Sequence, residues 1–128
     1  MSLRPALGTV LGSGSARAGV EHWWSQRVSA VASALLGLWF IYSLLTLPSL
    51  DRQSLIAWLA DPVSATLMLL FLLASFWHSA LGVQVVIEDY VHDKALRVAS
   101  LLAARYLHLL AGAAAAVAVL KLSFGEPA

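Results

Sequence analysis

The sequence predicts an all-α integral membrane protein with three transmembrane helices. Of its 128 residues, 60% are hydrophobic and only 12% are charged, whereas soluble domains carry about 25% charged residues. Three apolar runs, residues 28–47, 63–87 and 96–122, are each long enough to cross a hydrocarbon core of about 30 Å as a helix. We therefore expect a single three-helix domain over residues 20–128, preceded by a glycine-rich flexible arm over residues 1–19.

The composition also restricts the chemistry. The net charge of +1 gives no reason to expect a nucleic-acid partner. The chain has no cysteine, which excludes disulfides, thiolate zinc sites and iron–sulfur clusters held by this chain. Any metal bound here must therefore rely on histidine or carboxylate ligands.

The first helix begins at an interfacial anchor. Trp23 and Trp24 lie close to Arg27, and indole rings prefer the lipid headgroup layer. The uncharged run that follows ends at Pro48.

The second helix follows a short interfacial segment. The apolar stretch 55–60 is too short to span a bilayer, so we expect it to lie along the interface with Trp58 at headgroup level. Asp61 suits a helix N-cap and Pro62 suits the first turn, so the second helix begins here. It ends at a polar loop over residues 88–94.

The third helix is dominated by alanine, and small residues allow close helix approach in lipid. We expect its small-residue face to pack on another helix. Three thin helices make a poor closed bundle around a cofactor, so we also expect a partner subunit.

The basic residues predict the orientation. Five lie on the side that holds the N-terminus and the 88–94 loop (Arg4, Arg17, Arg27, Lys94 and Arg97), and two lie on the other (Arg52 and Lys121). The positive-inside rule places the first side in the cytoplasm, or in the matrix of a mitochondrial chain. The C-terminus then faces the opposite side.

His78 is the most informative residue because it interrupts the second apolar run. It lies ten positions before Glu88, or about 15 Å along a helix, which is near mid-membrane. An ionisable residue at that depth faces a partner or a cofactor, and imidazole is a common axial ligand of haem iron. A structural hydrogen bond to a neighbouring helix is the alternative. Gly82, one turn on, favours the ligand interpretation because it leaves room for a large flat group.

Each of three further residues has two possible roles. His108 reaches a depth similar to that of His78, so a second ligand is conceivable, but a hydrogen bond to a neighbouring helix or to a porphyrin edge is favoured. Arg105 lies one turn from His108 and either pairs with an anion, such as a haem propionate, or snorkels to the interface. Arg27 is either a positive-inside anchor or a partner of a propionate.

Asp89 and Tyr90 lie where the second helix meets water. A tyrosine hydroxyl is a neutral donor suited to a quinone carbonyl, and the adjacent carboxylate can orient it or relay protons. For Tyr90 alone, a place in the aromatic belt at the membrane interface is the simpler interpretation.

Taken together, the pattern resembles the smaller membrane-anchor, or cytochrome b, subunit of succinate:quinone oxidoreductase (succinate dehydrogenase). It comprises His78-x3-Gly82-x-Gln84-Val85-x3-Asp89-Tyr90-Val91-x3-Ala95-Leu96-Arg97, together with Gln26-Arg27-x-Ser29-Ala30 before it. The resemblance covers roughly residues 19–122. Its specific part runs from His78 to Arg97.

This resemblance implies a fold and a set of roles. The three helices would form half of a two-subunit haem-binding bundle, with His78 as one axial ligand of haem b and the companion cytochrome b anchor subunit supplying the other. Arg27 would lie near the haem propionates. Tyr90 would donate a hydrogen bond to ubiquinone, with Asp89 beside it. The resemblance assigns no role to Arg105 or His108, which we place only in the haem environment.

The resemblance also implies partners and a location. The flavoprotein and iron–sulfur subunits would dock on the cytoplasmic or matrix face, and electrons from succinate would pass to quinone without succinate touching this chain. Fumarate reduction with menaquinone is a variant of this function. A bacterial inner membrane is favoured because the sequence shows no Arg- and Ser-rich amphipathic presequence. The alternative from another class is a small transporter subunit, with His78, Arg105 and His108 as a proton or anion path.

Overall fold

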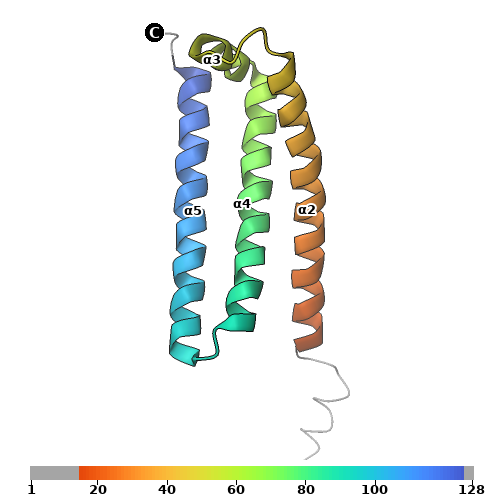
Figure 1. Cartoon of the computed structure of the whole chain (residues 1–128), viewed down its shortest axis with the longest axis vertical. Coiled ribbons are helices and arrows are strands. Elements are labelled where there is room, and N and C mark those ends of the chain that lie inside the picture. The colour runs from red at the N-terminus through yellow and green to blue at the C-terminus, as the bar shows by residue number, and fades with distance from the viewer. Residues whose placement is uncertain (1–14, 126–128) are drawn as a thin grey trace, which may run out of the picture.

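Residues 15–125 are described by the structure, a computed structural model, and within this range they form four helices. These are α2 (Ser15–Thr46), α3 (Arg52–Ala60), α4 (Pro62–Tyr90) and α5 (Lys94–Phe124). The three long helices run side by side, while the short α3 lies across one end of them (Figure 1). By length and composition α2, α4 and α5 can each cross a membrane, over Gly19–Thr46, Pro62–Tyr90 and Lys94–Phe124. The prediction of an all-α, multi-pass membrane protein is confirmed.

The helices extend beyond the apolar runs that predicted them. Helix α2 begins at Ser15, so residues 15–19 of the expected arm belong to a helix, while residues 1–14 lie outside the described range. Helix α4 continues through Glu88 to Tyr90, which shortens the expected 88–94 loop to residues 91–93. Polar residues at a membrane surface do not end a helix by themselves, because hydrated backbone and side-chain groups are tolerated there.

Aspartate caps fix where three of the helices start. The carboxylates of Asp51, Asp61 and Asp93 accept hydrogen bonds of 2.8 Å from the backbone N–H three residues on. Pro62 occupies the first turn of α4, as its sequence position predicts. The N–H of Ser64 holds the pKa of Asp61 below its ordinary value, because this hydrogen bond favours the charged carboxylate.

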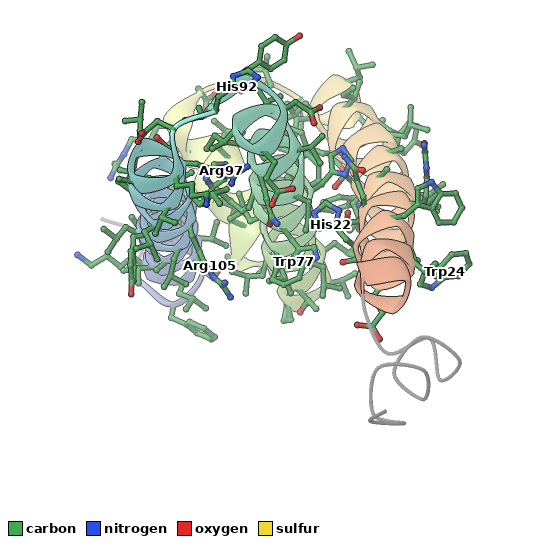
Figure 2. The ribbon with its side chains drawn as sticks, turned by 90° about the horizontal axis from the view of Figure 1, so that it is seen from below. His22, Trp24, Trp77, His92, Arg97 and Arg105 are labelled. Carbon is green, nitrogen blue, oxygen red and sulfur yellow. The ribbon has the colours of Figure 1, made fainter. Side chains whose placement is uncertain are left out.

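Helix α4 lies in the middle of a flat row. It packs against α2 on one side and α5 on the other, and within the described residues the backbones of α2 and α5 do not come close to each other. Viewed end-on, the three long helices form one layer rather than a closed bundle (Figure 2).

Two glycines allow α4 to approach α2 and α5 closely. A Cβ on Gly37 would lie 3.5 Å from the ring of Phe71, and one on Gly112 would lie 3.4 Å from that of Phe76.

Aromatic rings join α3 to the end of the row. Trp58 of α3 stacks on Trp39 of α2 with ring centroids 5.7 Å apart. This contact holds the short helix across the ends of the long ones.

The row buries very little of its own surface. Among the side chains described over residues 19–125, the only buried hydrophobic ones are Leu59, Ala65 and Val119. Most alanines of α5 stay exposed, including Ala111, Ala113 and Ala114. Helix α5 packs on α4, with Phe76 against Gly112, while both faces of the row stay open to lipid or to another subunit.

Candidate functional site

His78 lies near the middle of the 29-residue helix α4 and faces α2. Its Nδ1 atom is 3.2 Å from the Oγ atom of Ser29. Ser29 is 7% exposed and is the only buried polar residue in the part of the chain that the structure describes. The Ser29 hydroxyl also donates a hydrogen bond of 3.1 Å to the carbonyl oxygen of Gln26. Nδ1 is therefore the ring nitrogen that the fold engages, which leaves Nε2 for another group.

Space lies open beside this imidazole. A Cβ built on Gly82, one turn after His78, would meet no atom within 4 Å. The room that the sequence predicts at Gly82 is therefore present in the chain. In contrast, the glycines at positions 37 and 112 are filled by aromatic rings of the neighbouring helix.

These features fit one side of a haem. An imidazole with one nitrogen tied down and one free, next to an unfilled position, is what an axial ligand beside a porphyrin requires. Among the residues that the structure describes, no three His, Cys, Asp or Glu side chains gather where they could hold a metal ion. A metal bound by this chain would therefore draw most of its ligands from elsewhere, as haem iron does from the porphyrin.

His108 is engaged on both ring nitrogens. Its Nδ1 lies 2.7 Å from the carbonyl oxygen of Ala104 in its own helix, and its Nε2 lies 3.1 Å from the Oγ of Ser79 on α4. A hydrogen bond to a neighbouring helix is one of the alternatives that the sequence leaves open for His108. Ser79 follows His78 directly but points about 100° away around α4. The two imidazoles therefore lie on different sides of that helix.

Arg105 and Arg27 are not brought to His78 by this chain. Arg105 is exposed and emerges on the same side of the row as Trp77 (Figure 2). Arg27 is also exposed, with its guanidinium 5.5 Å from the centre of the Trp23 ring. His78 contacts Ser29 of α2, His108 contacts Ser79 of α4, and Arg105 is exposed, so no contact among the described residues joins these three groups.

Asp89 and Tyr90 form the last turn of α4 and are exposed. Tyr90 is 78% exposed, so its hydroxyl is open to a ligand or to lipid. Twelve residues separate Tyr90 from His78, or about 18 Å along the helix. The expected quinone-binding pair and the expected haem ligand thus lie at different depths of one helix.

Sequence reasoning missed a set of polar side chains on the α2 face that meets α4. Besides Ser29, this set includes His22 and Ser33. The Nε2 atom of His22 and the Oγ atom of Ser33 are both buried without a hydrogen-bond partner. Figure 2 shows His22 pointing between α2 and α4. Beside this set, the indole N–H of Trp77 donates to the Oγ of Ser25 at 2.9 Å. The available signal was their spacing, since positions 22, 29 and 33 fall on one helix face.

Comparison with known proteins identifies the family. The model of the family described as succinate dehydrogenase/fumarate reductase transmembrane subunit matches residues 1–120. The succinate dehydrogenase hydrophobic membrane anchor subunit of Rickettsia bellii is 36% identical over 107 residues, covering 84% of this chain and 86% of its own. The subunit of the same description from Rickettsia conorii is 40% identical over 86 residues, covering 66% of this chain and 68% of its own.

A more distant relative gives the same result. The corresponding subunit of Paracoccus denitrificans is 33% identical over 79 residues, covering 62% of this chain and 61% of its own. These matches confirm the resemblance that the residues from His78 to Arg97 indicated. The chain therefore belongs to the family of succinate dehydrogenase and fumarate reductase transmembrane subunits, as a hydrophobic membrane anchor rather than a catalytic subunit.

Proposed function

We propose that this chain is the haem b- and quinone-binding anchor of a succinate dehydrogenase. It docks the flavoprotein and iron–sulfur subunits at the membrane and helps to pass electrons from succinate to ubiquinone. The observation that carries the proposal is the environment of His78, whose Nδ1 is held by Ser29 and which adjoins the unfilled position at Gly82. The family assignment supports the same function.

In this proposal the chain supplies one axial ligand and the companion anchor subunit supplies the other. His78 would bind the iron through Nε2, and the bound haem would supply a one-electron redox centre within the membrane. The flat row supports a second subunit, because its open faces leave the Gly82 side uncovered. Arg27 would have to leave the Trp23 ring to reach a propionate, and Arg105 and His108 would contribute to the surroundings of the haem.

The quinone site would lie at the end of α4. The exposed hydroxyl of Tyr90 would donate to a quinone carbonyl, and Asp89 would orient it or relay a proton. In a bacterial cytoplasmic membrane this end would face the cytoplasm, where protons are available. The flavoprotein and iron–sulfur subunits would dock on the same side.

The test compares two histidines of similar depth in the purified four-subunit complex. His78→Ala should abolish the reduced b-type haem bands in the absorption spectrum, because no other group replaces its Nε2. His108→Ala is the matched control and should retain those bands, because both nitrogens of His108 are used within the chain. A wild-type haem spectrum in His78→Ala would overturn the proposal.

A further inference from the structure

We propose that Ser29 is the positioning residue that selects the tautomer of His78 and so makes Nε2 its ligating nitrogen. This inference rests on the proposed function, because it takes His78 to be a haem ligand. It assigns a role to a residue of α2 that lies 49 positions from the histidine it serves.

The direction of the hydrogen bond follows from the number of protons available. A serine hydroxyl has one proton to donate, and that of Ser29 goes to the carbonyl oxygen of Gln26, which can only accept. With that proton directed to Gln26, the Ser29 oxygen accepts from His78 in our proposal, and Nδ1 carries the proton. In a neutral imidazole the other nitrogen, Nε2, then holds a free lone pair.

In the second histidine–serine pair the hydrogen bond has the opposite direction, from serine to histidine. His108 gives its Nδ1 proton to a carbonyl of its own helix, and its Nε2 then accepts from Ser79. The tautomer of His108 is thus fixed by α5 itself, and its Nε2 is occupied. The tautomer of His78 is instead fixed across the contact between α2 and α4, and its Nε2 is left open.

Burial makes the Ser29 contact selective. Ser29 is 7% exposed at the contact between α2 and α4, so its burial limits the access of water to the Nδ1 proton. Loss of the acceptor would leave that N–H free to turn toward another group, and the ring orientation would be lost with it. A hydrogen bond that accepts from the far nitrogen of a ligating imidazole also raises its basicity, which favours the oxidised iron and lowers the midpoint potential.

The experiment uses the purified complex with three variants of α2. Ser29→Ala should weaken haem retention by about 10- to 100-fold, measured by transfer to excess apomyoglobin, and should raise the haem midpoint potential in a redox titration. Ser29→Thr keeps the hydroxyl and should restore both values. Ser33→Ala is the matched control, because the Ser33 hydroxyl is buried one turn away and has no partner to lose.

A failure of the Ser29 role can be distinguished from a failure of the proposed function. A wild-type potential and haem retention in Ser29→Ala, or an equal shift in Ser33→Ala, would overturn the role of Ser29 while His78→Ala still lost the haem. If Ser29→Ala does not assemble, Ser29→Cys replaces it, since a thiol has a similar shape but accepts weakly. A midpoint potential of Ser29→Cys above those of the wild type and Ser29→Thr supports the role. A wild-type potential in Ser29→Cys overturns it.

Discussion

The unfilled position at Gly82 leads to a prediction about where a cofactor lies. We replace Gly82 by Leu, which adds four carbons on the side of α4 that carries His78. Apart from the neighbouring residues and backbone of its own helix turn, nothing lies within 4 Å of the new Cβ, so this position has room for a side chain. It also removes a glycine from a helix interior, which favours the helix by up to about 1 kcal/mol in soluble hosts. The isolated chain should therefore fold as well as the wild type.

The expected cost falls on the haem alone. Forcing extra methylene groups into a filled space costs about 1–3 kcal/mol. Because about 1.4 kcal/mol corresponds to a factor of ten, the affinity for haem should fall about 5- to 150-fold. The purified complex should then contain less haem per flavin, while its helical circular dichroism is unchanged.

The control is the glycine that an aromatic ring already covers. Gly112→Leu places its side chain against Phe76, 3.4 Å from the new Cβ, and should destabilise the contact between α4 and α5. Its thermal midpoint should fall while the haem that remains bound keeps its spectrum. Full haem content and an unchanged spectrum in Gly82→Leu would refute the reasoning. Loss of the companion subunit from an otherwise folded Gly82→Leu chain would also refute it, by placing a helix rather than a porphyrin against Gly82.

Three further predictions concern the ends of the helices. Tyr90→Phe should lower quinone reduction while haem content and assembly stay at wild-type levels, and equal turnover in a quinone reductase assay would count against a role for the hydroxyl. The folded pKa of Asp61 is depressed by the Ser64 N–H, so its contribution to stability is present above the ordinary pKa of 3.8 and is lost as the pH falls through the lower folded value. The thermal midpoint of the wild type in detergent should therefore exceed that of Asp61→Asn at neutral pH, and the difference should shrink below pH 3.8; a constant difference would contradict the charge effect. A cysteine placed at Lys94 should react with an impermeant thiol reagent only from the cytoplasmic side, and reaction only from outside would reverse the topology.

The features that the sequence predicted well are local ones. The spans follow from runs of apolar residues, and the start of α4 follows from an aspartate and a proline in adjacent positions. The start of the first helix was placed too late: the expected span begins at residue 28 and the expected arm reaches residue 19, whereas α2 begins at Ser15. Here the helix continues outward from an apolar span, and propensity alone is too weak a guide to where it starts.

The contact between Ser29 and His78 could not be read from the sequence, because it joins positions 49 residues apart. It depends on the relative shift of two antiparallel helices, and that shift is set by packing such as Phe71 against Gly37. A change of one turn would place a different residue of α2 opposite the imidazole. Depth along a helix was predictable for His108 and His78, but the direction in which each ring points was not.

The flat arrangement bears on the proposal that one helix contacts both a haem and a quinone. In a closed three-helix bundle α2 and α5 would meet and cover one side of α4, and a position such as Gly82 would then be filled from within the chain. Here α2 and α5 stay apart in the described structure, so α4 contacts a neighbour on two sides and is open on the other two. Lateral contacts hold the His78 ring, and the open sides leave space at Gly82 and at the exposed end with Tyr90. A second subunit that covers one open side would therefore complete a cofactor site without moving any of the three helices.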